Sequence, residues 1–394
     1  MDKVIFLLNS PYPFYTGGRE TWIFNVANRL VNYYEVTIVA EDHFYKDNPS
    51  SRWEIDSRIK IINAKSLLSY KFTSWFLRSY FDYYHCFYRA FVMSRHVKRE
   101  INNHQKTHII ALDTVFLPLA YRHLKNKNKL LNTIISSRGP HAEIYGSYWP
   151  RKKKKILKIE SNNLLSADEI WSNGYDTQAQ LLGKGFRSEV IINGVDCEHI
   201  QSCNMPEQEE IKKAKGIKVG TIGTLLDLKG YPTMIGALKI VKELDPSVRI
   251  DLFAYGKGNP EGYELLARKL GVEENVHFLG ENKDAPLYVK QTDVLLALGT
   301  SEGSGMSMAA LEMLASGVPV IATDIPCYQQ LIEDGKNGYL ISEGDSEELA
   351  NKIIAVYKMN REEKQKVSLE AQKRIRKNDW SQVVSFVMNS LEQR

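Results

Sequence analysis

Several features are scarce or missing in this sequence, and each absence argues against a class of protein. No uninterrupted apolar run approaches the roughly 20 residues of a membrane-spanning helix. Of the four cysteines, only Cys197 and Cys203 lie close together, so no metal-ligand spacing is indicated and we expect reduced thiols in a cytoplasmic protein. No internal repeat or low-complexity tract is evident. The N-terminal MDKVIFLLNSPYPF is typical of a first core strand rather than of a secretory signal.

The composition that is present is ordinary for a soluble globular chain. With 394 residues, 43% of them hydrophobic and 25% charged, the chain is long enough for two domains that each bury a core. The formal net charge of +5 is modest, so basic residues matter only where they cluster. Nucleic acid is not an expected partner, because no recognition motif accompanies the charge.

Short apolar runs alternate with helical patterns along the chain, which predicts an α/β fold with parallel sheets built from βαβ units. The predicted strands of the first half are Val4–Leu8, Val36–Ala40, Ile59–Asn63, Ile109–Leu112, Thr133–Ser136, Asp168–Ser172 and Val190–Ile192. Those of the second half are Lys218–Ile222, Arg249–Ala254, Asn275–Phe278, Val294–Leu298 and Val318–Ala322.

The two halves are separated by Glu198 to Gly216, a charged stretch that we expect to be weakly ordered. We therefore place a domain boundary near residue 205, which gives an N-terminal domain of residues 1–204 and a C-terminal domain of residues 205–375. Residues 376–394 form a terminal segment that contains a short amphipathic helix, Trp380 to Leu391.

The most informative segment runs from Thr292 to Ile321 and predicts a strand, a glycine-rich loop, a helix and a second strand. Its loop, Ser301-Glu302-Gly303-Ser304-Gly305, has glycines that allow a close backbone approach to a ligand. The loop leads into a helix N-terminus, where free amides and the helix dipole favour phosphate or sugar oxygens. The segment therefore predicts a binding loop for an anionic or polyhydroxyl ligand.

This segment resembles the sugar-nucleotide site of family 4 glycosyltransferases, which have two Rossmann-like domains facing across a cleft (the GT-B fold). In that family a first Glu follows the strand and a second Glu comes eight positions later. Here Glu302 and Glu312 are the corresponding pair, but they are ten positions apart. Counted from Asp293, Glu302 occupies the first position; counted back from Glu312, Ser304 would occupy it. We favour the first alignment.

The resemblance assigns residues to roles. It implies that Glu302, Arg138 and Lys229 act in catalysis and that Glu312 binds the ribose hydroxyls. It implies that the terminal segment returns to the first domain. The implied donor-binding residues are Gly17, Gly18, Thr224, Lys229, Gly303, Ser304, Gly305, Met306, Ser307 and Glu312.

Gly17 and Gly18 lie between the first predicted strand and the first helix. A glycine pair is by itself only a turn signal. Its position is more informative, because ligands of open parallel sheets bind beyond the carboxyl ends of the strands. The pair also resembles the Gly-Gly loop of the family, whose amides approach the donor diphosphate and the acceptor.

Lys229 lies in Gly223-Thr224-Leu225-Leu226-Asp227-Leu228-Lys229-Gly230, again after a predicted strand. In the family an arginine and a lysine of this loop neutralise the two phosphates of the leaving nucleotide. The lysine is present here, but Thr224 replaces the arginine and adds no charge. Lys257 is a candidate for the missing cation.

Three residues are candidates for the acceptor or sugar side. Ser137-Arg138-Gly139 resembles a variant of the family loop near the donor sugar, and the planar donors of Arg138 suit a phosphate or sugar oxygen. His141 is a candidate base or acceptor ligand, although a structural histidine is commoner. Asp113 follows an earlier strand and is expected to point toward the site.

Two further turns match the family pattern. Asn193-Gly194-Val195-Asp196 resembles the turn that ends the first domain, and because Asn-Gly is a strong turn signal we interpret it as a hinge marker. Phe278-Leu279-Gly280 ends a strand where relatives approach the nucleotide base, with core packing as the alternative.

Two surface features bear on the acceptor. The chain is dense in aromatic residues from Tyr70 to Lys98, and Arg151 to Lys155 is a basic run that opens a helix. They are either a buried helix with a solvated charge run or an interfacial surface for anionic lipid. Because many family members act on lipid-linked acceptors, peripheral contact with the inner face of a membrane is expected from the resemblance.

The resemblance implies a retaining glycosyltransferase that moves a sugar from a nucleotide-diphosphate sugar to a hydroxyl of a glycan or lipid-linked acceptor in cell-surface polysaccharide synthesis. The nucleotide sugar is a co-substrate, no further cofactor is expected, and without a strict Asp-x-Asp pair no metal is implied. The alternative is a catalytically silent nucleotide-sugar-binding subunit of a glycosylation complex. A dinucleotide oxidoreductase is disfavoured, because no full Gly-x-Gly-x-x-Gly fingerprint opens a helix.

Overall fold

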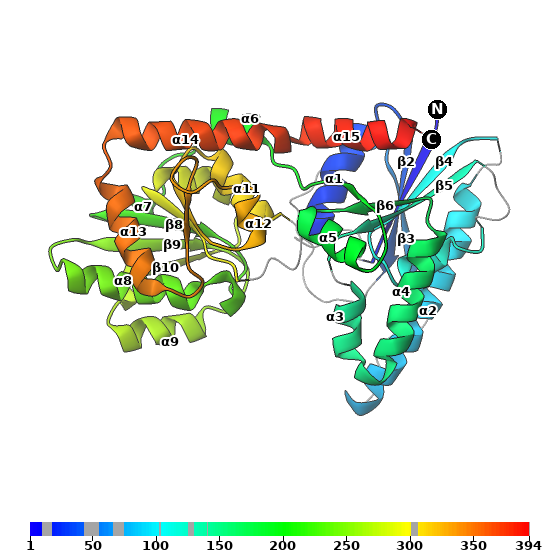
Figure 1. Cartoon of the computed structure of the whole chain (residues 1–394), viewed down its shortest axis with the longest axis horizontal. Helices are drawn as coiled ribbons and strands as arrows, with labels where there is room; N and C mark the ends of the chain where they lie inside the picture. The colour runs from blue at the N-terminus through cyan, green and yellow to red at the C-terminus, as the bar shows by residue number, and fades with distance from the viewer. Residues whose placement is uncertain are drawn as a thin grey trace. The chain divides into compact units, whose positions relative to one another are not determined.

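A computed structural model of the chain describes residues 1–9, 18–42, 55–65, 75–101, 104–124, 130–139, 141–300 and 306–393. The chain forms two compact units (Figure 1). Unit 1 contains Met1–Ile192 and Trp380–Arg394, and unit 2 contains Asn193–Glu302 and Met306–Asp379. The chain therefore first leaves unit 1 after Ile192, whereas the sequence analysis places the boundary after residue 204.

Unit 1 is built on a seven-stranded sheet in the order β3-β2-β1-β4-β5-β6-β7, and all of its pairings are parallel. The strands are β1 (Lys3–Leu8), β2 (Glu35–Asp42), β3 (Lys60–Lys65), β4 (Thr107–Ala111), β5 (Leu131–Ser137), β6 (Glu169–Ser172) and β7 (Glu189–Val190). Each of the six residues of β1 is buried, as expected for a central parallel strand covered on both faces.

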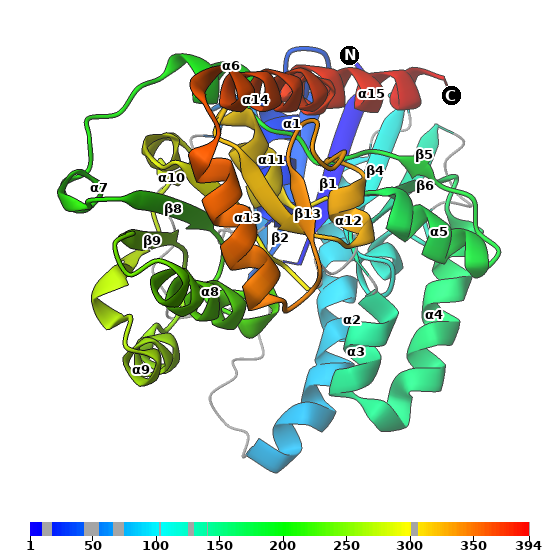
Figure 2. The same ribbon diagram turned by 60° about the vertical axis from the view of Figure 1, so that its left-hand side comes forward.

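Helices connect the strands of unit 1 (Figure 2). They are α1 (Gly18–Leu30), α2 (Trp75–Glu100), the 3₁₀ helix η2 (Leu117–Ala120), α3 (His141–Tyr148), the 3₁₀ helix η4 (Pro150–Lys152), α4 (Lys153–Ser166), α5 (Tyr175–Gly183) and the C-terminal α15 (Trp380–Glu392). Met93 and Val97 of α2 pack on Ile5 and Ile109 of the central strands. This packing buries one face of the sheet.

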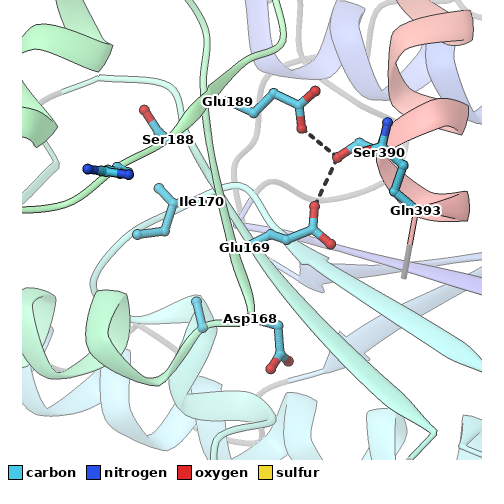
Figure 3. A pocket seen from close by; sticks show the side chains of 9 residues that line it. Asp168, Glu169, Ile170, Ser188, Glu189, Ser390 and Gln393 are labelled. Carbon is cyan, nitrogen blue, oxygen red and sulfur yellow. Dashed lines mark hydrogen bonds between the residues drawn. The ribbon is translucent and has the colours of Figure 1, made fainter.

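A buried serine fixes the C-terminal helix α15 to the sheet of unit 1 (Figure 3). The Oγ atom of Ser390 lies 2.9 Å from Oε2 of Glu169 on β6 and 2.7 Å from Oε2 of Glu189 on β7. The indole Nε1 of Trp171 donates to the same Oγ over 3.1 Å. Because Ser390 is 219 residues from Trp171 in sequence, these bonds fix a distant segment to two strands at once.

Unit 2 contains a six-stranded parallel sheet in the order β10-β9-β8-β11-β12-β13. Its strands are β8 (Ile217–Ile222), β9 (Ile250–Tyr255), β10 (Val276–Gly280), β11 (Val294–Ala297), β12 (Val320–Thr323) and β13 (Tyr339–Ile341). The order reverses between β8 and β11, which makes the carboxyl ends of these two strands the switch point of the sheet.

The helices of unit 2 are α6 (Cys197–Ser202), α7 (Glu209–Lys213), η5 (Asp227–Lys229), α8 (Tyr231–Leu244), α9 (Glu261–Leu270), η6 (Glu273–Asn275), α10 (Ala285–Tyr288), η7 (Val289–Gln291), α11 (Met308–Ala315), α12 (Pro326–Gln329), α13 (Ser346–Lys358), α14 (Arg361–Ile375) and η8 (Arg376–Asn378). Helices α8 and α13 pack together over one face of the sheet (Figure 2). Leu238 of α8 and Ile353 of α13 belong to the same buried core as Val219 of β8.

The prediction of two parallel α/β sheets is confirmed. One strand was not predicted, and one local expectation differs from the structure. The short strand β13 (Tyr339–Ile341) was not predicted, because three residues are too few to show a period. The stretch after Glu198 is not simply irregular, since it contains α6 and α7; Asp196 caps α6 by accepting a hydrogen bond from the His199 amide.

None of the helices in the described parts of the chain has the length and hydropathy of a membrane span.

The buried His108 on β4 generates a prediction about pH. Its ring is 1% exposed, its Nδ1 lies 3.1 Å from the Asn132 amide nitrogen, and burial lowers its pKa from 6.5 to about 4. The unfolded chain therefore binds a proton before the folded chain does as the pH falls. We expect the free energy of unfolding to fall between pH 6.5 and pH 4 by up to roughly 3 kcal/mol on account of His108.

His108→Gln removes this contribution, so its unfolding free energy should depend less on pH in that window, as measured by urea denaturation at a series of pH values. His104→Gln, at an exposed position, is the matched control and should keep the wild-type slope. Identical slopes for wild type and His108→Gln would contradict the assignment.

Candidate functional site

At the carboxyl edge of the unit 1 sheet, a chain of polar contacts links the ends of β1 and β4 to helices α1 and α3. Arg19 of α1 donates from a terminal nitrogen to Oδ1 of Asn9 over 2.8 Å, and Nδ2 of Asn9 lies 3.2 Å from the hydroxyl of Tyr145 on α3. Tyr145 in turn donates to Oδ2 of Asp113 over 2.8 Å. Burial and the Asp113 charge raise the pKa of Tyr145 well above its usual value, so the phenol remains a donor.

Asp113 is fully buried and its carboxylate is already well supplied with donors. Its Oδ1 accepts hydrogen bonds from the amides of Val115 at 2.7 Å and Phe116 at 2.6 Å. This oxygen therefore satisfies amides at the turn that leads into η2. The carboxylate orders the loop after β4, and a contact between Asp113 and an acceptor stays a prediction.

Arg138 follows β5 directly and is held by an aromatic ring. Its guanidinium carbon lies 3.9 Å from the ring centre of Trp22 on α1, and its Nε donates to Oγ of Ser136 over 3.1 Å. Burial lowers the pKa of Arg138 below its usual value, but a guanidinium so altered still carries its charge at neutral pH. The structure thus holds a fixed cation at the end of β5.

His141 begins α3 and is 7% exposed. Its backbone amide donates to the carbonyl of Gly139, whose φ of 152° favours glycine. Burial lowers the pKa of His141, so the imidazole is neutral at pH 7. Its Nδ1 is buried and has no hydrogen-bond partner among the residues that the structure describes. A neutral imidazole with an unused ring nitrogen suits the predicted role of base or acceptor ligand.

At the carboxyl edge of the unit 2 sheet, the loops after β8 and β9 are in direct backbone contact. A Cβ atom on Gly256 would lie 1.7 Å from the carbonyl oxygen of Gly223, so only glycine fits there. The amide of Leu225 donates to the carbonyl of Lys257 over 2.8 Å. The two loops therefore form one rigid edge.

The cations predicted for this edge lie on those two loops. Lys229 ends η5, and its side chain runs past Gly223, where an added Cβ would be 3.8 Å from the lysine Cγ. Thr224 and Lys257 are exposed on the same rigid edge, because Leu225, the residue after Thr224, bonds to the backbone of Lys257. The structure therefore brings the loop of Lys257 next to the loop of Thr224, and the role of Lys257 as the substitute cation stays a prediction.

The loop after β8 is also tied to the end of β11. Gly230 has a φ of 78°, and a Cβ atom on it would lie 2.4 Å from the carbonyl oxygen of Leu298. The amide of Thr300 donates to the carbonyl of Leu228 over 2.8 Å. The loops that flank the switch point are therefore held together just before residues 301–305.

The other described donor candidates lie on helix α11 or directly before it, apart from Gly18. Ser307 is its N-cap and accepts a hydrogen bond from the amide of Ala310. Met306 is buried, and Glu312 is partly buried on the helix. Gly18 is the first residue of α1. Gly17, Glu302, Gly303, Ser304 and Gly305 lie outside the described residues, so the choice between Glu302 and Ser304 stays open.

The sequence analysis missed several side chains that organise these edges. Trp22 and Tyr145 resemble ordinary core aromatics in the sequence, and only the fold brings them to Arg138 and Asp113. Asn378 lies far from any motif but bonds to Asn193 and Met306. A signal for Asn193 was present in the Asn-Gly turn, whereas nothing in the sequence around Asn378 indicated its partners.

The cap formed by Asp113 generates a prediction. Asp113→Ala removes the acceptor of three amides and one phenol, which should lower the free energy of unfolding by about 3 kcal/mol. Tyr145→Phe removes one donor and should cost about 1 kcal/mol. Urea denaturation measures both changes. An unchanged denaturation midpoint in Asp113→Ala would show that the carboxylate does not have this structural role.

Comparisons with known proteins agree with this geometry. Residues 205–377 match the family model described as glycosyl transferases group 1. The chain is 35% identical over 217 residues to a putative glycosyltransferase EpsD of Bacillus subtilis, an alignment that covers 53% of this chain and 55% of the relative. It is 31% identical over 176 residues to the lipopolysaccharide glucosyltransferase WaaG of Escherichia coli, covering 43% and 46%. The chain thus spans about half the length of the curated relatives it matches.

Among solved structures, Alr3699/HepE of Anabaena in complex with UDP matches with a TM-score of 0.72 over 100% of both chains at 17% identity. A glycosyltransferase of Rickettsia africae matches with a TM-score of 0.73 over 100% of this chain and 98% of that chain, at 14% identity. At these identities the matches show the fold, two parallel Rossmann-like sheets. The family match covers residues 205–377, and the matches to solved structures cover the whole chain.

Proposed function

We propose that the chain is a retaining glycosyltransferase that moves a sugar from a nucleotide-diphosphate sugar to a hydroxyl group. The proposal rests on the carboxyl edge of unit 2, where loops after three parallel strands are joined by backbone bonds and two of these loops carry lysines. Helix α11, with Ser307 as its N-cap, follows the third strand in the chain. Such an edge attracts a diphosphate, because lysines, loop amides and helix N-termini all favour negative charge.

In this proposal each side chain has a defined task. Lys229 and Lys257 neutralise the diphosphate, Ser307 and the first turn of α11 face the donor, and Glu312 accepts hydrogen bonds from the ribose hydroxyls. Glu302 and the glycines of its loop hold the donor sugar. Arg138 and His141, on the edge of unit 1, contact the sugar or acceptor side. Thr224 adds a hydroxyl to the diphosphate site.

The chemistry requires stabilisation of charge on the departing nucleoside diphosphate. Fixed donors and cations provide this without reorganisation when the bond to the anomeric carbon breaks. The acceptor hydroxyl then attacks the face that the leaving group has left and gives its proton to the departing phosphate oxygen, so the anomeric configuration is retained. We assign no enzyme nucleophile and no metal to this step.

The relatives suggest the class of product. They include a lipopolysaccharide glucosyltransferase and a phosphatidyl-myo-inositol mannosyltransferase, both named for lipid-containing acceptors. We infer that this chain acts in cell-surface polysaccharide synthesis, on a glycan or lipid-linked acceptor in the cytoplasm. A solved structure of the same fold holds UDP, which makes UDP the first nucleotide to test.

One observation favours a second candidate, a nucleotide-sugar-binding subunit without catalysis. Thr224 is uncharged at a position where the family has a cation, and Lys257 is exposed and attached only through its loop. If Lys257 does not reach the diphosphate, binding persists while departure of the leaving group is slow. Detectable donor hydrolysis or transfer by the pure protein excludes this candidate.

The donor site is tested by ligand-induced stabilisation. We expect one of UDP, GDP, ADP and CMP to raise the unfolding temperature of the chain, and NAD to have no effect. At about 100 times its dissociation constant, a ligand adds ~2.7 kcal/mol to the free energy of unfolding. Glu312→Ala should abolish the shift and the turnover.

The matched control is Glu264→Ala, which removes a carboxylate from the surface of another unit 2 helix, α9, and should keep the shift. A wild-type chain that none of the nucleotides stabilises would contradict the proposed function.

We further infer that unit 1 contacts anionic lipid through the basic run that opens α4. Arg151, Lys153, Lys154 and Lys155 are exposed there. Exposed aromatic rings lie on neighbouring helices, with Tyr84 on α2 42% exposed and Tyr148 on α3 66% exposed. Nζ of Lys152 lies 5.7 Å from the ring centre of Tyr84, so basic and aromatic groups form one surface. This combination is typical of proteins that bind at a membrane interface.

Vesicle co-sedimentation tests this contact. The chain should bind phosphatidylcholine vesicles that contain phosphatidylglycerol and not vesicles of phosphatidylcholine alone. Substitution of Lys153, Lys154 and Lys155 by glutamine should weaken binding roughly a hundredfold, since each lysine near the surface contributes about 1 kcal/mol. The control replaces Lys212, Lys213 and Lys215, three exposed lysines of unit 2, and should bind like wild type. Equal loss in both triple variants would argue against a specific surface.

A further inference from the structure

Three segments that are far apart in sequence are hydrogen-bonded together in unit 2. Nδ2 of Asn193 donates to the carbonyl oxygen of Met306 over 2.7 Å, across 113 residues. Nδ2 of Asn378 donates to the carbonyl oxygen of Asn193 over 3.4 Å and lies 3.3 Å from the sulfur of Met306. We call Asn193, Met306 and Asn378 the crossover cluster.

The name reflects where these residues lie along the chain. Asn193 is the first residue of unit 2 after the chain leaves unit 1, and Asn378 lies next to Asp379, the last residue before the chain returns. The two segments also pair through their backbones, because the amide of Val195 donates to the carbonyl of Asn378 over 2.9 Å and Val195 forms a parallel bridge with Asp379. The amide of Cys197 adds a bond to Oδ2 of Asp379.

Met306 connects these segments to helix α11, which carries residues of the proposed donor site. It immediately precedes Ser307, the N-cap of α11, and Glu312 lies further along the same helix. Its carbonyl is bonded to Asn193 and its sulfur contacts Asn378, so both its backbone and its side chain are fixed from outside the helix. The position of the first turn of α11 therefore depends on two asparagines that the proposed function does not use.

The crossover cluster buries more polar groups than the stability of the fold requires. Asn193 is 7% exposed, Met306 5% and Asn378 0%. The two groups next to the side-chain amide of Asn378, the Asn193 carbonyl and the Met306 sulfur, are both acceptors. The amide nitrogen must therefore face them, and Oδ1 must face away. That oxygen is buried without a hydrogen-bond partner among the described residues, which costs ~1–3 kcal/mol. An apolar side chain of similar volume would avoid the cost, but it could not hold the Asn193 carbonyl.

We propose that Asn378 and Asn193 are positioning residues for the sugar-nucleotide donor, which act by holding Met306 and the start of α11 against the segments where the chain passes between its two units. The inference rests on the proposed function, because it assigns a role in the binding and turnover of that donor. Neither residue needs to touch the donor, since each acts through Met306.

Asn378→Leu separates positioning from stability. It removes the amide and the buried unpartnered oxygen together, so the unfolding temperature should stay the same or rise. The dissociation constant of the nucleoside diphosphate that stabilises the wild type should rise at least tenfold, and kcat/KM for the donor should fall by at least as much. Isothermal titration, a donor-consumption assay and thermal unfolding of the full chain give the three readouts.

Asn193→Ala is the second variant, and it tests the positioning role if Asn378→Leu fails to fold. It removes the bond to the Met306 carbonyl, and the dissociation constant should again rise. The matched control is Asn337→Ala. Asn337 is a buried asparagine of the same unit whose amide donates to the Leu331 carbonyl over 2.8 Å. It should lower the unfolding temperature and leave the dissociation constant unchanged.

The outcomes are distinguishable. The proposal is supported if Asn378→Leu or Asn193→Ala binds the diphosphate more weakly than the wild type. Asn337→Ala must bind normally although its unfolding temperature is as low as that of the weakened variant. Folded variants at both positions with wild-type binding and turnover overturn it and leave the proposed function intact. A wild-type chain that binds none of UDP, GDP, ADP and CMP overturns the proposed function and this inference with it.

Discussion

Parallel pairing of the strands is the constraint on which the rest of this structure depends. Parallel strands place all their carboxyl ends at one edge of a sheet, so the residues directly after β1, β4 and β5 share one edge in unit 1 and those directly after β8, β9 and β11 share one edge in unit 2. Both sheets are buried on two faces, and these edges are where polar groups can gather. Asn9, Asp113 and Arg138 all follow strands for this reason.

Close backbone contact turns such an edge into a site of fixed geometry. In unit 2 the carbonyl of Gly223 leaves no space for a side chain at Gly256, and the carbonyl of Leu298 leaves none at Gly230. Loops in contact through their backbones have little freedom to adjust, so the positions from which their charged side chains extend are fixed before a ligand binds. In unit 1 the equivalent rigidity comes from side chains, through the Asp113 carboxylate and the stack of Arg138 on Trp22.

The part of this arrangement that depends on local pattern could be predicted from the sequence, and the part that depends on distant contacts could not. Buried strands such as β1 and β11 are visible as apolar runs, and the Ser307 cap follows from residues that are adjacent in the chain. Asn378 bonds to a residue 185 positions away, so no window of sequence contains both partners. Asp113 is expected to face the site because it follows a strand, and the structure adds that one of its carboxylate oxygens accepts from amides of the next turn, which a sequence does not reveal.

The charges on the unit 2 edge also constrain how such a site can accelerate a reaction. In the proposed function, Lys229 and Lys257 would attract the diphosphate of the intact donor as well as that of the departing nucleotide, and equal stabilisation of both lowers KM without raising kcat. A gain in kcat requires groups that interact more strongly as the glycosidic phosphate oxygen becomes charged. The amides at the start of α11 satisfy this condition, because their direction is fixed and their interaction grows with the charge that they face. The direction of those amides is set by Met306 and Ser307, and hence by the asparagines that hold Met306. In the proposed function, the orientation of this helix end is therefore a feature on which the rate depends.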